Sequence, residues 1–260
     1  MIRRGIGVQS FVSAGVSTDA DAQAFITAAG ITDATQQSAI NTLVVDLKTY
    51  GIWTKMKAIY PFVGGTASAH KFNLKDPRDM DAAFRLVFSG GWTHSSSGAK
   101  VNGINAYANT YFNLNNFTST NAGASVYRNA MTNGGSDIAT YAGSNTSIFY
   151  NAWSSNLQTV AAFSNNGTLN YADTSGLGLY TTNALSGTTK GYRNGVVKLT
   201  NTTQGAPPNV NSQIGRNTYG VEYADSRYGF AAYHDGLTDT EAANLYTAVQ
   251  AYQTTLSRNV

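Results

Sequence analysis

Residues 188–200 read Thr-Thr-Lys-Gly-Tyr-Arg-Asn-Gly-Val-Val-Lys-Leu-Thr, and they are the strongest indication of β structure in the chain. Asn194-Gly195 separates two short runs, Gly191–Arg193 and Val196–Lys198. A two-residue type I′ turn requires positive φ at both central positions, which Asn-Gly tolerates. The stretch therefore predicts an antiparallel β-hairpin.

Similar runs lie on both sides of this hairpin. From Ile104 to Phe230, short apolar or aromatic runs alternate with clusters of Asn, Gly, Ser and Thr. A spacing of about ten residues between such runs is typical of a β-sandwich or barrel. Two more strands are predicted before Ile104. Residues 90–103, which follow these two strands, are predicted as a Gly- and Ser-rich loop. The other predicted strands are Ile52–Val63, Phe84–Phe88, Tyr107–Leu114, Ala124–Tyr127, Ile138–Tyr141, Ser147–Trp153, Thr159–Phe163 and Gly178–Thr182.

Helical patterns flank the predicted strands. Thr18 and Asp19 can cap a first helix that ends at Gly30. A second helix is predicted from Asp33 to Gly51, with one apolar face formed by Ile40, Leu43, Val44 and Leu47. We therefore divide the chain into an N-terminal arm (1–17), a helical lead segment (18–51) and a sandwich (52–260).

The sandwich region closes with a third helix. Thr238 and Glu241 have the spacing of a capping box, in which each residue bonds the other's backbone N–H. The apolar residues that follow recur in steps of three and four, at Ala242, Leu245, Val249, Tyr252 and Leu256. We expect this stripe to pack against the sheet.

The chain carries few charges. Charged residues make up 12% of the 260 residues, about half the usual share, and the formal net charge is +3. Between Val101 and Thr189 the charged residues are Arg128, Asp137 and Asp173. A nearly neutral polar surface does not steer nucleic acid or anionic lipid. We therefore expect no nucleic acid binding. No apolar run is long enough to span a membrane, so we also expect no membrane insertion.

Catalytic motifs are missing from the sequence. Glycoside hydrolysis requires two carboxylates that flank the scissile bond. The chain has two glutamates, Glu222 and Glu241, and Glu241 is already assigned to the capping box. The chain has no cysteine, and the three histidines do not have metal-ligand spacing. We therefore assign no catalytic residue and expect a protein that is not an enzyme.

One acidic cluster could hold a cation. Asp79-Met80-Asp81 can place two carboxylates on one face, where they could bind Ca²⁺. The alternative is a solvated turn, because Asp76-Pro77 favours a turn and Arg78 neutralises part of the charge. We predict no other cofactor.

Aromatic side chains are the candidates for ligand binding. Trp92, Tyr150 and Trp153 lie in or near predicted loops, where binding groups concentrate, and His94 follows Trp92 closely. Their rings could stack on the apolar faces of sugars while Asn, Ser and Thr bond the hydroxyls. The alternative is that these rings belong to the core, as most aromatic residues in a sandwich do.

Several short motifs, taken in order, resemble concanavalin A-like, laminin-G-like jelly-roll domains. They are Ala58–Phe62 with Gly64-Gly65, Asn102–Tyr107, Tyr192–Gly195, Ile214–Asn217, Tyr228–Phe230 and Leu237–Glu241. The resemblance implies a mainly β, concanavalin A-like jelly-roll β-sandwich with an N-terminal helical segment and a C-terminal helix. The final strand departs from that family, because Phe230–Tyr233 stands where acidic residues are frequent.

The N-terminal part, Asp21 to Phe62, resembles the start of bacteriophage structural proteins that join a helical lead to a jelly roll. This resemblance implies a non-enzymatic structural and adhesive protein on the exposed surface of a virion, in the capsid, a head fibre or the tail. Expected partners are other virion proteins, further copies of the same chain and a host-surface glycan. Two alternatives stay open: a carbohydrate- or receptor-binding module at the tail tip, and a glycan depolymerase.

Overall fold

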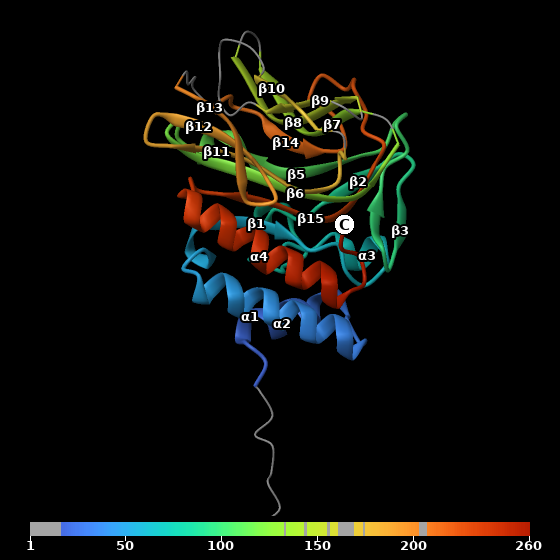
Figure 1. Ribbon diagram of the computed structural model, residues 1–260. Helices are drawn as coiled ribbons and strands as arrows, with labels where there is room; N and C mark the ends of the chain where they lie inside the picture. The colour runs from blue at the N-terminus through green and yellow to red at the C-terminus, as the bar shows by residue number, and fades with distance from the viewer. Residues whose placement is uncertain are drawn as a thin grey trace, which may run out of the picture.

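Two antiparallel β-sheets face each other, and helices cover the outer face of one of them (Figure 1). The computed structural model describes residues 17–132, 134–142, 145–154, 157–160, 169–173, 175–202 and 207–260. Within the ranges 141–154, 157–160 and 169–170 it describes the backbone and not the side chains. Nearly all of the predicted arm, residues 1–17, lies outside the described residues.

The first sheet has eight strands and forms the middle layer of the molecule. In spatial order the strands are β13 (Val196–Asn201), β12 (Thr188–Arg193), β11 (Gly178–Leu185), β6 (Asn121–Met131), β15 (Ser226–His234), β4 (Gly98–Lys100) and β3 (Thr93–Ser95), with β1 (Met56–Tyr60) beside β15. The central strands β11, β6 and β15 pair along most of their lengths, and β1 shares one side of β15 with β4.

The second sheet has seven strands and packs on the inner face of the first. Its strands in order are β10 (Leu169–Ala172), β9 (Leu157–Val160), β8 (Asn145–Ser154), β7 (Gly135–Ala142), β14 (Asn211–Ile214), β5 (Tyr107–Asn113) and β2 (Val87–Ser89). The core between the sheets is rich in buried aromatic rings, and Phe112 stacks on Tyr233 with ring centroids 4.8 Å apart.

The helices build a second core on the outer face of the eight-stranded sheet (Figure 1). Helix α4 (Asp239–Thr255) lies on the sheet, and α2 (Ala34–Thr49) and α1 (Ala20–Ala29) form the layer beyond it. The predicted apolar face of α2 is completely buried. Each such side chain stabilises the fold by about 1.5–3 kcal/mol through its removal from water.

The helix caps agree with the sequence. Asp19 and Asp33 accept backbone N–H bonds at the starts of α1 and α2, and Gly30 ends α1 in the left-handed conformation. Thr238 and Glu241 form both bonds of the predicted capping box. The prediction of a mainly β jelly-roll sandwich with an N-terminal helical segment and a C-terminal helix is confirmed.

Three local predictions were wrong. The strand predicted from Ile52 begins only at Met56, because residues 53–55 form a 3₁₀ turn, η1 (Trp53–Lys55). Phe84 does not start a strand: it has a φ of 59° and ends a second 3₁₀ turn, η2 (Asp81–Ala83). The predicted loop at 90–103 contains the hairpin β3–β4, because β4 finds a partner in β15. Short helices α3 (Ala67–His70) and η3 (Leu114–Asn116) complete the described elements.

Candidate functional site

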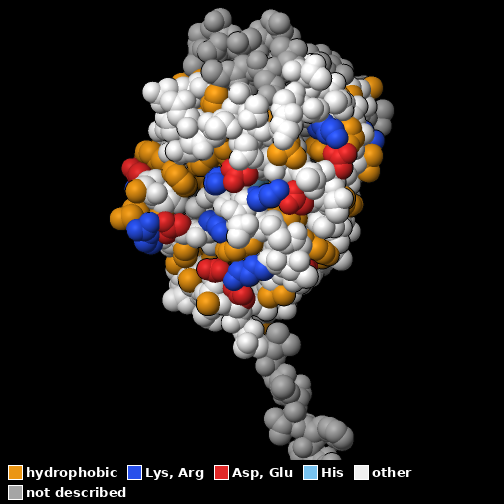
Figure 2. Space-filling model, turned by 90° about the vertical axis from the view of Figure 1, so that its left-hand side faces the viewer, with side chains coloured by type: hydrophobic (Ala, Val, Ile, Leu, Met, Phe, Trp, Pro, Cys, Tyr) orange, Lys and Arg blue, Asp and Glu red, His pale blue; other side chains and the backbone are white. Residues whose placement is uncertain are grey.

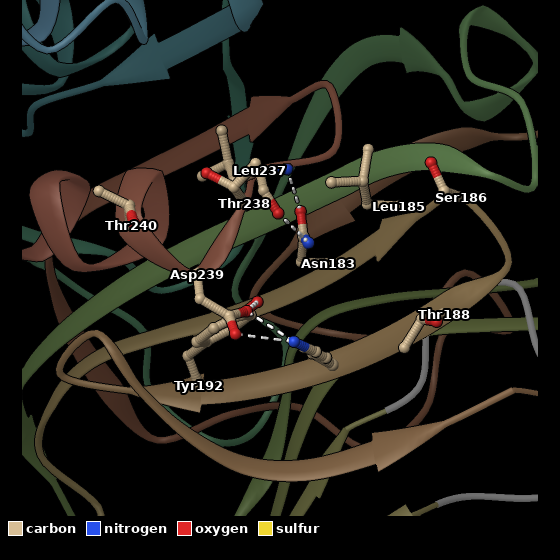
Figure 3. Close-up of a pocket in the computed structure, with 10 residues that line it drawn as sticks. Asn183, Leu185, Ser186, Thr188, Tyr192, Leu237, Thr238, Asp239 and Thr240 are labelled. Carbon is tan, nitrogen blue, oxygen red and sulfur yellow. Dashed lines mark hydrogen bonds and ion pairs between the residues drawn. The ribbon is translucent and has the colours of Figure 1, made fainter.

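A polar cleft lies on the outer face of the eight-stranded sheet, between the β11–β12 hairpin and the start of α4 (Figure 3). Its volume is about 360 Å³. Most of its lining residues are polar and uncharged, and they come from segments about 50 residues apart in sequence. The lining residues are Asn183, Leu185, Ser186, Thr188, Lys190, Tyr192, Leu237, Thr238, Asp239 and Thr240.

The hairpin wall follows from the two-residue period of a strand, which places alternate side chains on one face. Asn183 pairs with Lys190, and Leu185 pairs with Thr188, so these four side chains share the outer face. Ser186 and Gly187 make the turn between the strands, both with positive φ. A two-residue turn of this kind fixes the register of the pair.

The opposite wall is held to the hairpin by one amide. The Asn183 side chain donates to Leu237 O at 2.8 Å and accepts from Leu237 N at 2.6 Å. Figure 3 shows this amide pointing from the sheet to the segment before α4. Because the capping box begins at the next residue, the same contact sets where α4 begins over the sheet.

Asp239 is the polar centre of the cleft (Figure 3). Its carboxylate accepts from Lys190 Nζ at 2.7 and 2.8 Å and from the Tyr192 hydroxyl at 2.8 Å. The Lys190 ammonium, helped by the Tyr192 hydroxyl, holds the pKa of Asp239 below its ordinary value. The Asp239 side chain is 58% exposed, so its ionised oxygens can still accept bonds from a ligand.

The cleft is equipped for hydrogen bonding. Beside Asp239 and Lys190 it presents the hydroxyls of Ser186 and Thr240, with Leu185 as an apolar surface. The Asp239 carboxylate is the one carboxylate among its lining residues. A second carboxylate, which glycosidic cleavage requires, does not line it.

Trp92 and His94 lie at the other edge of the same sheet. Trp92 donates its indole N–H to Tyr107 O at 2.9 Å, and its ring packs edge-on against Phe88. His94 packs against the same Phe88 and bonds His70. Both predicted residues are half-buried, and the structure does not bring them to the cleft, because β3 and β12 lie near opposite edges of the sheet.

The other two predicted rings belong to the second sheet. Tyr150 and Trp153 lie in β8, and their side chains lie outside the described residues. Their strand is not part of the sheet that carries the cleft. Their assignment as glycan contacts stays a prediction.

Asp79 and Asp81 form ion pairs with basic side chains. Arg85 bonds Asp79 at 2.8 Å and Asp81 at 2.9 Å, and Lys71 bonds the second oxygen of Asp79. In the described part of the chain no group of three or more His, Asp or Glu residues is placed to hold a metal ion. A calcium ion here would have to compete with Arg85 for both carboxylates, and the calcium assignment stays a prediction.

One buried contact has the composition of a nucleophile and its base. Ser125 Oγ lies 3.0 Å from His234 Nε2, and His234 Nδ1 lies 2.8 Å from the backbone oxygen of Asp235. Both side chains are buried under the helices, with exposed fractions of 1% and 0%. A substrate cannot reach this hydroxyl in the described structure, so we assign the pair to the core.

The cleft residues could not be found from local sequence signals. The sequence identified the capping box and the β12–β13 hairpin, but nothing near Lys190 indicates that it reaches Asp239. Their contact depends on how α4 packs on the sheet. The one available signal was Asp239 itself, an acid in the first turn of a predicted helix.

No known protein family matches the sequence, and no curated protein matches it. Among the described residues, none of the helices has both the length and the apolar character needed to cross a membrane. Solved structures do match. A sialidase from Trypanosoma rangeli in complex with sialic acid aligns with 73% of this chain and 32% of its own, at 11% identity and a TM-score of 0.52.

Two further matches have lower TM-scores. Domain 4 of an extracellular GH43 arabinanase from Geobacillus stearothermophilus, in complex with arabinotriose, aligns with 74% of this chain and 98% of its own, at 14% identity and a TM-score of 0.44. The binding domain of botulinum neurotoxin serotype D aligns with 76% of this chain and 52% of its own, at 10% identity and a TM-score of 0.47. The chain thus spans about a third of the sialidase and half of the toxin domain. The sialidase match supports the β-sandwich fold.

Proposed function

We propose that this chain is a non-catalytic carbohydrate-binding β-sandwich that acts as a structural and adhesive protein on the exposed surface of a bacteriophage particle. The observation that carries the binding part is the cleft at Asp239. It offers one ionised carboxylate, an ammonium and several hydroxyls next to an apolar surface. This set of groups matches a neutral ligand rich in hydroxyls.

The state of the carboxylates supports a protein without catalysis. Most of them serve in ion pairs, which neutralise them: Asp19, Asp21, Asp76, Asp79, Asp81, Asp137, Asp173, Asp225, Asp235, Asp239 and Glu241. Glu222 accepts from Ser136 Oγ and Asn217 Nδ2. A general acid needs a raised pKa and access to substrate. The pKa of Asp239, the one carboxylate of the cleft, is lowered instead.

The position on a particle is proposed from the resemblance of Asp21 to Phe62 to phage structural proteins. Many copies of one chain on a particle convert weak single contacts into strong attachment, because the second contact is effectively intramolecular. The partners in this proposal are other virion proteins, further copies of the chain and a host-surface glycan. The proposal requires no cofactor.

A glycan array tests the binding part. Beads that display many copies of the full chain should be retained on a subset of the neutral glycans of the array. Asp239→Asn should reduce this retention about tenfold or more, because a hydrogen bond to a charged group contributes about 1.5–3 kcal/mol. Asp21→Asn is the matched control: it also removes an exposed carboxylate paired with a lysine, but on α1.

Two outcomes would contradict the proposal. Equal losses for both variants, or no retained glycan, would remove the cleft as a binding site. Release of reducing ends from a host polysaccharide would instead support the depolymerase alternative, and Asp79→Asn and Asp81→Asn would then be tested first. Antibody labelling of intact particles checks the proposed surface position.

A further inference from the structure

Two histidines meet at the edge of the sandwich, 24 residues apart in sequence. His70 ends α3, and His94 lies in β3, which Figure 1 shows beside α3 at one side of the molecule. The Nδ1 atoms of the two rings are 2.9 Å apart, which is a hydrogen-bond distance. The contact ties the turn at α3 to the edge hairpin β3–β4.

The neighbouring backbone fixes which ring donates. The Gly65 N–H donates to His70 Nε2 at 3.2 Å, so this nitrogen carries a lone pair. A neutral imidazole has one N–H, and His70 must therefore carry its proton on Nδ1. His70 then donates to His94 Nδ1, which has to be unprotonated. One proton arrangement satisfies all three groups.

The surroundings give no compensation for an added proton. Phe62 packs edge-on against His70, while Phe88 and Trp92 pack against His94. The charged group that acts on His70 is the cation Arg258, which opposes protonation. Lys71, next to His70, is paired with Asp79. In the described part of the chain, no ion pair or hydrogen bond joins either ring to a carboxylate.

The pKa values move in the direction that this environment requires. Burial, the neighbouring His94 and Arg258 lower the pKa of His70 to about 3. Burial also lowers the pKa of His94, which is less enclosed than His70. His94 is therefore the ring that takes up a proton first. A proton on its Nδ1 would place two N–H donors against each other.

Apart from the packing of Ala99 in the core between the sheets, the hairpin that His94 anchors has few other attachments. Strand β3 pairs with β4 at three positions, and β4 pairs with β15 at two. Additional bonds are Trp92 Nε1 to Tyr107 O, Asn129 Nδ2 to Ser97 O and the Lys100–Asp225 ion pair. A short edge strand such as β3, with a short neighbour such as β4, opens at low free-energy cost.

We propose that the His70–His94 contact is an acid-sensitive latch: protonation of His94 breaks the hydrogen bond to His70 and releases the β3–β4 hairpin from the α3 turn, while the rest of the sandwich stays folded. The released segment carries Trp92 and His94, so the surface that the protein presents at this edge changes with pH.

Native-state hydrogen exchange of the full chain tests this latch. For a ring that titrates freely only when open, the open population increases about tenfold per pH unit well below 6.5, or roughly 25-fold between pH 7 and pH 5. After correction for intrinsic exchange rates, amides in 93–100 should lose protection by this factor. Amides in β6 exchange through global unfolding, so they should stay more protected than the hairpin amides at both pH values and serve as the internal reference.

A double variant separates the latch from general acid weakening. In His70→Gln, the amide oxygen can accept from Gly65 N and the amide nitrogen can donate to residue 94. With His94→Gln added, the bonds are retained and neither position titrates. The hairpin of His70→Gln/His94→Gln should show the same protection at both pH values, whereas His234→Gln, which alters the remaining histidine, should keep the wild-type response.

The proposal fails if the wild-type hairpin keeps its protection at pH 5, or if the double variant loses protection equally. An NMR titration of the unaltered chain gives a second measurement that needs no substitution. Because the ring titrates freely only when the hairpin is open, the His94 ring signals of the closed state should keep their neutral positions as the pH falls through 6.5. A free titration of His94 near pH 6.5 would overturn the latch.

Discussion

Three charged residues stand alone in a long uncharged stretch, and the structure buries all of them. Arg128 and Asp137 are fully enclosed and paired at 3.1 Å, and the Tyr228 hydroxyl donates to the same carboxylate at 2.8 Å. The guanidinium of Arg128 also lies over the Tyr180 ring, whose hydroxyl donates to Asp173. Burial raises the pKa of Asp137 even though Arg128 opposes the rise. The pair therefore carries a large desolvation cost.

We expect Arg128→Met to lower the free energy of unfolding by about 3–5 kcal/mol, because it leaves the Asp137 charge buried without its partner. Arg128→Met/Asp137→Leu should recover most of this loss, since an apolar pair of similar volume removes both charges. Urea denaturation measures both variants. A double variant as unstable as the single one would mean that the ion pair itself stabilises the fold.

His234 makes stability depend on pH. Burial lowers its pKa to about 4, against about 6.5 in an unfolded chain. The unfolded state therefore binds more protons between these values, so stability is complete above pH 6.5 and falls as the pH drops towards 4. The slope is about 1.4 kcal/mol per pH unit for one group. Denaturation at pH 7, 5.5 and 4.5 should show a shallower fall for His234→Gln than for the wild type.

At the scale of the element, two hairpin turns with similar φ angles differ in their contacts with the rest of the fold. Gly187 and Gly195 both have positive φ in two-residue hairpin turns. A Cβ at Gly195 would lie 2.8 Å from Ala243 Cα on α4, whereas a Cβ at Gly187 would meet nothing within 4 Å. The second hairpin thus packs against the helix as well as turning the chain.

We expect Gly187→Ala to cost about 1–2 kcal/mol, which is the price of the left-handed conformation for a residue with a Cβ. Gly195→Ala should cost more, because α4 must also move. Thermal unfolding of both variants measures the difference. Equal losses of stability in the two variants would show that α4 can move away from an added Cβ without a loss of free energy.

The elements predicted from sequence were those specified by neighbours in the chain. Asp19, Asp33 and Thr238 start their helices through bonds within one turn, and Asn194-Gly195 sets its own turn. Strands β3 and β4 carry no such signal, because residues 93–100 become strands only through pairing with each other and with β15. The cleft has the same character: Lys190 and Asp239 meet because two distant elements pack together.

At the scale of the whole molecule, the surface charges cancel locally. Figure 2 shows Lys and Arg side chains lying next to Asp and Glu side chains across one face. Opposite charges that lie a few ångströms apart compensate each other, so these ion pairs produce little electric field at a distance. The described part of this face therefore presents a polar surface without a strong potential.

This neutrality predicts how binding responds to salt. Glycan retention should change less than about twofold between 50 and 500 mM NaCl, because uncharged hydroxyls release no counterions. Retention on a nucleic acid column, by contrast, falls steeply with salt when several phosphates are contacted. We expect no retention of this chain on DNA at 150 mM NaCl, and salt-dependent retention there would contradict the neutral-surface interpretation.

The packing of α2 on α4 has a consequence for biosynthesis. The apolar face of α2 is covered by the last long helix, and Tyr252 bonds Pro61 O across 191 residues. A ribosome makes the N-terminal partner many seconds before its cover, at about 5–20 residues per second. During that interval the apolar face of α2 is exposed on the nascent chain. We therefore expect chaperones to remain bound to the nascent chain until α4 has been translated.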